Sequence, residues 1–293
     1  MSTPSSPAPV GKDGLDKFYT SPATAAICIN IVADMYEWDW DLVVEPSAGD
    51  GSFYSLFPPP TTGCQFVGID LAPEHPDIST MDFFDYSPSY VAGSNTATKV
   101  DKTLVIGNPP FGRVSSTAIR FFNHAAEWAT VIAFIVPRTF RRVSVQNKLD
   151  MCFHLVHDHD IPTSPCCFSP PMMAKCCFQV WERRSAIRER IELPTSHTDW
   201  TFLPYGPRDA VGQPTPPDDA DFAIRAYGGK CGVVCRTGLD ALRPKSWHWI
   251  KSNIDVAHIV SRFEQLDYSI STNTARQNSI GRADLVALYA TAY

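Results

Sequence analysis

The sequence has no long uninterrupted run of apolar residues. A helix that spans a membrane needs about 18 or more of them in succession, and no segment of the 293 residues approaches that length. The N-terminus also lacks the apolar core of a secretory signal. These absences predict a protein that is not secreted, has no membrane partner and works in a reducing intracellular compartment, cytoplasmic or nuclear.

The paired cysteine motifs of zinc sites are missing as well. The nine cysteines include the doublets Cys166-Cys167 and Cys176-Cys177, but no two are spaced as C-x-x-C. Adjacent residues of an extended chain point to opposite faces, so each doublet offers one ligand per face. We therefore expect structural thiols and no metal site.

Positive charge is not in excess, because the net charge is −6. That balance disfavours a protein held to nucleic acid by bulk electrostatics, although a local basic cleft would still allow an enzyme that acts on nucleic acid. Residues 1–14 are rich in Ser and Pro and are predicted to form a disordered tail. Prolines cluster from Pro194 to Pro217. We therefore expect one domain over residues 15–194 and a smaller α+β module over residues 195–293.

The first domain contains a series of short apolar runs that each end in a polar or glycine-rich turn. The runs lie at residues 42–44, 66–69, 104–107 and 131–136. Such runs are typical of strands buried in a parallel sheet. Helical patterns follow Ser21-Pro22 and cover residues 116–128. Two further strands, at residues 153–161 and 176–181, are expected to form an antiparallel hairpin at the sheet edge. The sequence therefore predicts a doubly wound, Rossmann-like α/β fold with a mostly parallel sheet.

The turn after the first run contains the loop Glu45-Pro46-Ser47-Ala48-Gly49-Asp50-Gly51. Ligands of open α/β sheets bind beyond the C-terminal ends of the strands, where this loop lies. Its two glycines allow the backbone to approach a ligand closely, although an ordinary tight turn would use them too. Asp70 ends the next run, and a carboxylate there can accept both hydroxyls of a ribose or can cap a loop.

A nicotinamide dinucleotide is the competing ligand for such a loop. Its pyrophosphate needs the pattern G-x-G-x-x-G, whereas Tyr54 occupies the place of the third glycine and Glu45 would repel a phosphate. A ligand with an ammonium group and no phosphate fits better, and S-adenosylmethionine is such a ligand. Asp82-Phe83 could then accept from the adenine amino group and stack on its ring, or Asp82 could be a solvated acid in a turn.

The most specific pattern is the sequence Asn108, Pro109, Pro110 and Phe111, which follows the third run. An exocyclic amino nitrogen is a poor nucleophile because its lone pair is delocalised into the ring. The Asn108 side-chain oxygen and the Pro109 carbonyl can accept its two hydrogens and draw the nitrogen towards tetrahedral geometry. The two prolines fix both acceptors in advance, and Phe111 offers a ring on which an extruded base can stack. A plain Pro-Pro turn would explain the prolines alone.

These segments, in this order, resemble the motifs of S-adenosylmethionine-dependent amino-methyltransferases of the adenine-N6 type, with the gamma-class motif order. The resemblance spans residues 15–183 and implies a class I methyltransferase fold. It implies that Asn108, Pro109, Pro110 and Phe111 are catalytic. It also implies a larger cofactor-binding set, namely Phe18, Tyr19, Thr20, Glu45, Ser47, Ala48, Gly49, Asp50, Gly51, Asp70, Asp82 and Phe83.

Three positions qualify the resemblance. Phe168 lies where the family often has a second aromatic residue that stacks on the base. Ser21 intervenes before Pro22, where family members often have proline directly. Pro58-Pro59-Pro60 stops the segment after the glycine loop, so the usual first helix is expected to be truncated.

The four-residue motif also resembles those of enzymes that methylate adenine in RNA, guanine N2 in ribosomal RNA, and glutamine in protein. The glutamine enzymes usually have tyrosine in place of Phe111, so Phe111 favours a nucleobase. The resemblance thus predicts methylation of adenine N6 in nucleic acid, with DNA favoured. RNA adenine-N6 or guanine-N2 methylation and a non-catalytic nucleic-acid-binding subunit stay open, and the sequence predicts no oligomeric state.

Arginines follow two of the expected strands. Arg138, Arg141 and Arg142 could grip phosphates or begin a solvated helix. The run from Arg183 to Arg190 is expected on a solvated helix face.

The module after residue 195 is expected, from its position alone, to recognise the target or to have an accessory role. Strands are expected near residues 222–227 and 232–235, and a helix near residues 255–266. Several aromatic and glycine-rich positions could contact nucleic acid or fill a small core, namely Tyr227, Gly228, Gly229, Lys230, Trp247 and Trp249.

Overall fold

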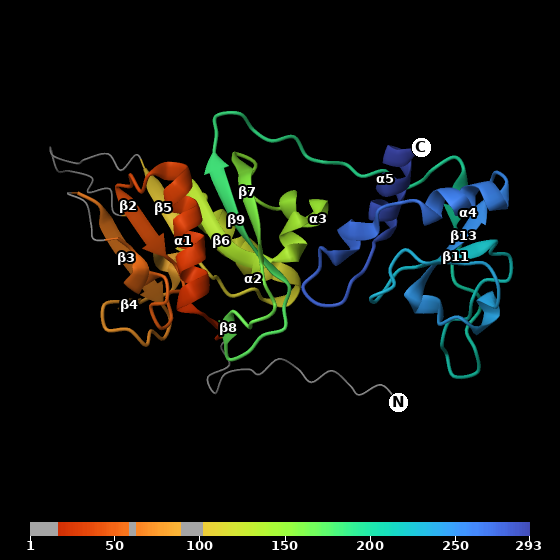
Figure 1. Cartoon of the computed structure of the whole chain (residues 1–293), viewed down its shortest axis with the longest axis horizontal. Coiled ribbons are helices and arrows are strands. Elements are labelled where there is room, and N and C mark those ends of the chain that lie inside the picture. Colours follow the sequence, from red (N-terminus) through yellow and green to blue (C-terminus); the bar gives the residue numbers. More distant parts are fainter. Residues whose placement is uncertain (1–16, 59–62, 89–101) are drawn as a thin grey trace. The chain divides into compact units, whose positions relative to one another are not determined.

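The computed structural model describes residues 17–58, 63–88 and 102–293. The tail predicted for residues 1–14 lies outside them. Contacts between residues divide the chain into two compact units, Met1–Arg190 and Ile191–Tyr293, which are described one at a time (Figure 1). None of the described helices is long and apolar enough to cross a membrane.

A seven-stranded sheet forms the centre of the first unit, with the strand order β4-β3-β2-β5-β6-β9-β7. The first five of these strands are mutually parallel, whereas β9 is antiparallel to β6, and β7 is antiparallel to β9. The bounds are β2 Leu42–Glu45, β3 Gln65–Asp70, β4 Ser79–Thr80, β5 Thr103–Gly107, β6 Val131–Pro137, β7 Phe153–Ile161 and β9 Cys176–Arg183. This mostly parallel sheet with an antiparallel edge hairpin confirms the predicted Rossmann-like α/β fold class.

The central strands explain why the sequence shows continuous apolar runs instead of alternation. Every residue of β2, β5 and β6 is buried. Both faces of these strands are covered, so both sets of alternating side chains need to be apolar.

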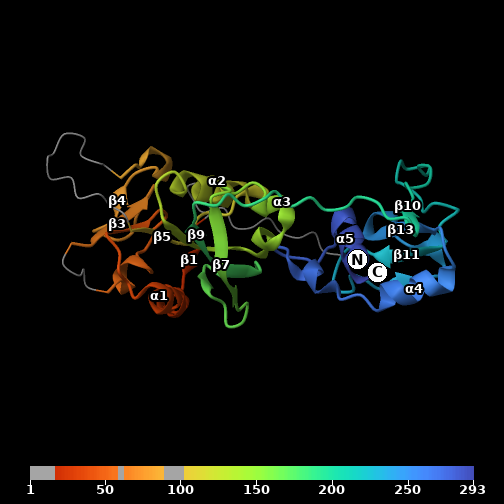
Figure 2. The ribbon, with the colours of Figure 1, turned by 90° about the horizontal axis from the view of Figure 1, so that it is seen from above.

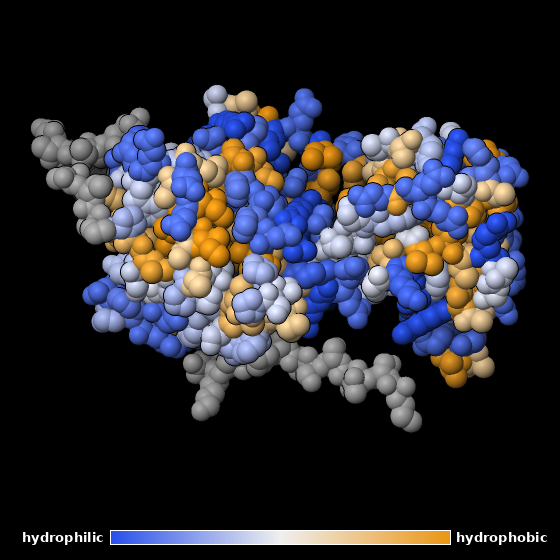
Figure 3. All heavy atoms as spheres, viewed as in Figure 1, coloured by the Kyte–Doolittle hydropathy of each residue, from blue (hydrophilic) through white to orange (hydrophobic). Residues whose placement is uncertain are grey.

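Helix α1 (Pro22–Tyr36) covers one face of this sheet. It begins at Ser21, whose side chain accepts a hydrogen bond from the Thr24 amide at 3.3 Å. Its buried side packs with Val43 and Leu104 of the central strands. Figure 3 shows apolar residues on the outer side of the same helix, where Ile27 is 46% exposed. After the glycine loop the chain forms only a 3-10 turn, Tyr54–Leu56, so the expected truncation of the first helix is found in the described residues.

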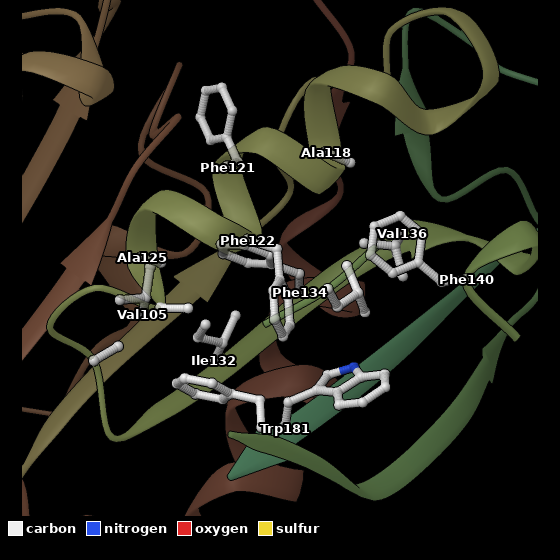
Figure 4. Packing of buried hydrophobic residues seen from close by; sticks show 14 of the residues in the cluster. Val105, Ala118, Phe121, Phe122, Ala125, Ile132, Phe134, Val136, Phe140 and Trp181 are labelled. Atoms are coloured by element: carbon white, nitrogen blue, oxygen red, sulfur yellow. The ribbon is translucent and has the colours of Figure 1, made fainter. Parts of the chain in front are cut away.

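Helix α2 (Ser116–Ala125) covers the opposite face (Figure 2). Phe122 projects from it into a cluster with Ile132 and Phe134 of β6 and with Trp181 of β9 (Figure 4). The short helix α3 (Val143–Gln146) follows β6. The sheet therefore has one helical layer on each side, and the polar ends of its strands are left for a ligand site.

The second unit contains a four-stranded antiparallel sheet of order β10-β13-β11-β12. Helices α4 (Val256–Glu264) and α5 (Arg282–Ala292) share a core with one face of that sheet. The strands are β10 Trp200–Phe202, β11 Phe222–Arg225, β12 Val234–Cys235 and β13 Trp247–Ser252. The sequence analysis did not anticipate β10, β13 or α5.

Two expectations about side chains in these units change with the structure. Trp247 and Trp249 are 8% and 1% exposed and form a small core on the other face of the second sheet, so they do not present rings to a partner.

The run that begins at Arg183 is not a helix face. Arg183 ends β9 and lies over the Phe153 ring, and Arg188 lies over the Trp181 ring.

The core of the second unit yields a prediction about its stability. Phe263 is fully buried among Trp200, Phe222 and Tyr289. We expect Phe263→Ala to lower the free energy of unfolding of this unit by about 3–5 kcal/mol, measured by urea unfolding with tryptophan fluorescence. Glu264→Ala, on the exposed side of the same helix, is the control and should change it by less than about 0.5 kcal/mol. Equal effects of the two variants would contradict the packing described.

Candidate active site

The glycine loop that follows β2 has a conformation that requires its glycines. Gly49 and Gly51 have φ angles of 52° and 83°, in the region that glycine adopts most readily. A Cβ atom on Gly49 would lie 2.7 Å from the Tyr19 ring, and one on Gly51 would lie 2.9 Å from the His75 ring. Both glycines are therefore fixed by close neighbours as well as by the turn.

Asp70, at the end of β3, is held against this loop. One carboxylate oxygen accepts a hydrogen bond from the Gly49 amide at 2.9 Å, and the other accepts from the Ala72 amide at 2.8 Å. These two bonds fix the orientation of the carboxylate beside the cavity that it lines.

A short strand carries the predicted Phe-Tyr-Thr segment to the same place. β1 (Tyr19–Thr20) pairs antiparallel with β8 (Phe168–Ser169), which lies in the proline-rich loop between β7 and β9. The Tyr19 hydroxyl donates to Glu74, in the segment that follows β3. The sequence analysis did not anticipate this two-stranded pairing, which positions the N-terminal motif.

Asn108 follows β5, and hydrogen bonds hold both its side chain and its backbone carbonyl. Its Nδ2 donates to the Phe18 carbonyl at 3.1 Å, and its own carbonyl accepts from Ser47 Oγ at 3.0 Å. Because Phe18 offers an acceptor, the amide nitrogen must face it, and the opposite flip would place two oxygens together. The Asn108 Oδ1 atom is then buried without a partner among the described residues.

A cavity of about 330 Å³ opens beside Asn108. Most of the predicted site residues line it, namely Phe18, Tyr19, Ser47, Gly49, Asp70, Asp82, Phe83, Asn108, Pro109, Pro110 and Phe111. A smaller cavity of about 20 Å³ shares four of them and adds Thr20, Glu45, Ala48 and Asp50. Of the predicted set, Gly51 lines neither cavity.

The smaller cavity is bordered by polar atoms that lack partners. Thr20 Oγ1, Glu45 Oε2 and Asn108 Oδ1 are all buried and accept no hydrogen bond in the part of the chain that the structure describes. Burial raises the pKa of the Glu45 carboxyl well above its usual value; the Tyr54 amide opposes this shift, and the neighbouring Asp50 and Asp70 add to it. Unsatisfied buried acceptors are uncommon in folded proteins, and a ligand with several donors is a physical reason for three of them.

The Asp82-Phe83 pair is built into a turn more firmly than the sequence suggested. Asp82 accepts a hydrogen bond from the Phe84 amide at 3.0 Å and is half-buried. The Phe83 ring is 2% exposed and stacks on Phe121 with the ring centres 5.1 Å apart. One part of Phe83 therefore belongs to the core, and its remaining surface borders the cavity.

Residues outside the predicted motifs also line the larger cavity. Phe121 of α2 is one of them, and Met172, after β8, is another. Phe121 lies on the buried stripe of its helix with Ala118, Phe122 and Ala125, so the sequence alone gave no signal that it also borders a cavity. Phe168, expected as a second base-stacking residue, is 6% exposed and packs in the core beneath β1 without lining either cavity.

The arginines after β6 are engaged by acids of the edge strand. Arg138 forms an ion pair with Asp160 at 2.9 Å, and Arg141 forms ion pairs with Asp158 and Asp160. The hydrogen bond to Asp158 raises the pKa of the Arg141 guanidinium. These two cations neutralise acids of their own sheet, which argues against a role in gripping phosphates.

The backbone after Phe111 is strained. Val114 and Ser115 have φ angles of 53° and 63°, a region that costs a β-branched residue on the order of 1–3 kcal/mol. Ser115 Oγ lies 2.7 Å from Thr139 Oγ1, in the turn after β6. This tight turn brings α2, with Thr117 and Phe121, against the cavity.

Among the described residues, no group of three or more His, Cys, Asp and Glu side chains is placed to hold a metal ion. No protein-family model and no curated protein sequence matches the chain. Among solved structures, a Pyrococcus horikoshii protein described as a "putative RNA methyltransferase" matches at 16% identity and a TM-score of 0.41, over 58% of this chain and 88% of that chain. A likeness at this level assigns neither a family nor a substrate.

The buried Glu45 carboxyl yields a prediction about pH. Its pKa is raised above the usual 4.5, so above that pH the folded state retains a proton that the unfolded state has lost. Wild-type stability should therefore fall relative to Glu45→Gln as the pH rises, by at most about 1.4 kcal/mol per pH unit. Thermal unfolding across the pH range measures the difference.

Glu37→Gln is the control for this measurement, because Glu37 is exposed. Its stability difference from wild type should not grow with pH. A Glu45→Gln difference that is independent of pH would show that the carboxyl is not held in its neutral form by burial.

Proposed function

We propose that the chain is an S-adenosylmethionine-dependent methyltransferase that transfers a methyl group to the exocyclic N6 of adenine in nucleic acid, with DNA favoured over RNA. The observation that carries the proposal is the Asn108 amide. Its nitrogen is held by Phe18, and its oxygen lies buried beside the cavity without a partner. An acceptor fixed in this way is complementary to an amino group with two hydrogens to donate.

The catalytic role of Asn108 and Pro109 is to change the geometry of that amino group. Two acceptors, the Asn108 oxygen and the Pro109 carbonyl, hold the two hydrogens and localise the lone pair on nitrogen. When bound, S-adenosylmethionine would supply a methyl group bonded to a positively charged sulfur, and the electron pair of the broken sulfur–carbon bond would stay on that sulfur as the amino nitrogen gains the methyl group. The methylated nitrogen is then positively charged and strongly acidic, so its surplus proton passes to water without a dedicated base.

The two cavities fit the two ends of the cofactor. An ammonium group has three donors, and Thr20 Oγ1 and Glu45 Oε2 are buried acceptors without partners at the smaller cavity. The positive charge would also favour the ionised form of Glu45, which burial alone disfavours. A dinucleotide pyrophosphate would instead place negative charge near this carboxyl, which supports the choice of cofactor.

The larger cavity offers groups for the nucleoside end and for the target base. Asp70 is oriented by two backbone amides and borders the cavity, as expected of a ribose acceptor. Asp82 and Phe83 border it from the turn after β4. Phe111 borders it next to the two prolines and can stack on an extruded base.

The proposal predicts that Asn108→Ala abolishes methyl transfer while S-adenosylmethionine still binds. Tritiated methyl transfer to unmethylated DNA and to RNA, measured side by side, should show activity in the wild type and a fall of at least about 100-fold in the variant. Asn30→Ala, at an exposed position on α1, is the matched control and should retain full activity.

The outcomes of that assay separate the alternatives. Transfer to RNA alone would replace DNA by RNA as the substrate, and product analysis would distinguish adenine N6 from guanine N2. Binding of nucleic acid without transfer would indicate a non-catalytic subunit. The proposal would be contradicted if the wild type transferred no methyl group to either polymer and bound no S-adenosylmethionine in calorimetry.

A second prediction concerns the cofactor alone. Asp70→Ala removes a charged acceptor for the ribose and should raise the Kd for S-adenosylmethionine about 10- to 100-fold, measured by calorimetry. Asp77→Ala removes an exposed acid from the segment after the same strand and should leave the Kd unchanged. Equal affinity of the Asp70→Ala variant and the wild type would remove Asp70 from the cofactor site.

A further inference from the structure

We propose that residues 225–246 of the second unit form a binding surface for the phosphate backbone of nucleic acid. This inference rests on the proposed function in that the methylated base is taken to belong to a nucleic acid. The surface is called the basic face below. It consists of Arg225 at the end of β11, the turn that includes Lys230, and the segment 236–246 between β12 and β13.

The basic face departs from the charge of the rest of the chain. It contains five basic residues, Arg225, Lys230, Arg236, Arg243 and Lys245, against one acidic residue, Asp240. The whole chain has a net charge of −6. A local excess of positive charge in an acidic protein is the arrangement by which such a protein can bind a polyanion.

The cations of the basic face are available to a partner. Lys230, Arg236, Arg243 and Lys245 are all exposed, and none of them forms an ion pair within the second unit. The other lysine and one arginine of this unit behave differently, because Lys251 pairs with Asp221 at 3.0 Å and Arg262 with Asp199 at 2.7 Å.

A small apolar core fixes the segment that carries three of these cations. Leu239 and Leu242 pack against Trp247 and Trp249 on the face of the sheet opposite α4 and α5. The Trp249 indole donates to the Pro244 carbonyl at 3.2 Å. The segment therefore covers the sheet as an anchored layer, with Arg236, Arg243 and Lys245 on its outside. Cations placed in advance lose less conformational entropy on binding.

Arg225 and the nearby acids show that charge is separated along this face of the sheet. The Arg225 guanidinium lies over the Trp247 ring at 5.1 Å, at the end of β13 that joins the basic segment. Asp221 lies at the other end of β11, where Lys251 and the Ser252 amide bind its carboxylate. The acids of residues 218–221 therefore gather away from Trp247 and do not neutralise the basic face.

The choice of phosphate over a carboxylate partner rests on the proposed function, in which the substrate is a nucleic acid. Three of the five cations are arginines, whose planar guanidinium groups bind phosphate oxygens, like carboxylate oxygens, in a bidentate manner. Binding through the backbone would be independent of sequence and would depend strongly on salt.

The test uses the full chain and a labelled duplex of mixed sequence of about 20 base pairs, with binding followed by fluorescence anisotropy between about 50 and 200 mM salt. The variant Arg236→Ala/Arg243→Ala/Lys245→Ala should bind at least about 10-fold more weakly at the lower salt concentration. The magnitude of the slope of log affinity against log salt concentration should fall by about 2 to 3. Each lost phosphate contact reduces that magnitude by about 0.9.

A charge-preserving variant, Arg236→Lys/Arg243→Lys/Lys245→Arg, is the matched control and should retain most of the affinity and the slope. The thermal unfolding midpoint of both variants should match that of the wild type, because none of the three side chains is part of a core. An alanine variant that binds like the wild type, with the same salt slope, would overturn the proposal.

Failure of this surface and failure of the proposed function are distinguishable. If the alanine variant keeps its affinity while Asn108→Ala loses methyl transfer, the proposed phosphate-binding surface is contradicted and the proposed methyltransferase activity is supported. If the alanine variant loses affinity while the wild type methylates neither DNA nor RNA, the proposed surface is supported and the proposed activity is contradicted.

Discussion

The hydrogen bond from Asn108 Nδ2 to the Phe18 carbonyl is the contact on which the candidate site depends. It joins the end of β5 to a segment 90 residues earlier in the chain, and it decides which way the amide faces. Because the amide nitrogen donates to Phe18, the amide oxygen is buried beside the cavity and has no partner among the described residues. A buried acceptor in that state costs on the order of 1–3 kcal/mol. A bound amino group would recover that cost, so the buried Asn108 oxygen favours a ligand that can donate a hydrogen bond to it.

The fold supplies the rest of the geometry by bringing strand ends together. β2, β3 and β5 are parallel neighbours, so Glu45, Asp70 and Asn108 follow strands that end at the same edge of the sheet. The N-terminal segment has no place in this sheet and is held instead by β8 and by Asn108. The site therefore rests on one rigid scaffold and one short strand pair.

The sequence could predict the scaffold because burial on both faces leaves a direct trace in composition. The apolar runs of β2, β5 and β6 have no other simple explanation, and parallel order then places the motifs that follow them at one edge. What it could not predict are features set by partners far away in the chain. Arg141 looked free for a ligand until β7 placed Asp158 beside it. Phe168 was expected to stack on a base, but the pairing of β8 with β1 places it in the core.

The second unit was harder to predict for a related reason. In β13, Trp247 and Trp249 face a small core on one side of the sheet, while Ile250 belongs to the larger core under α4 and α5. Large side chains on both faces hide the alternation that marks a half-buried strand. The sequence therefore predicted the strands near residues 222 and 232, which pair as β11 and β12, and missed β13, the other partner of β11.

The charges of the two units are suited to two different ligands. Asp50, Asp70 and Asp82 line the cavities of the first unit, and their carboxylates would attract a cationic cofactor. The same carboxylates repel the phosphates of a nucleic acid, because like charges in a partly buried site are weakly screened. Arg138 and Arg141, which follow β6, do not offset this repulsion, since Asp158 and Asp160 neutralise them. In the second unit, Lys230, Arg236, Arg243 and Lys245 are exposed and form no ion pair within that unit, so they are cations that can attract a polyanion. Under the proposed function, this separation of charges would let one chain bind a cationic cofactor and a polyanionic substrate at the same time.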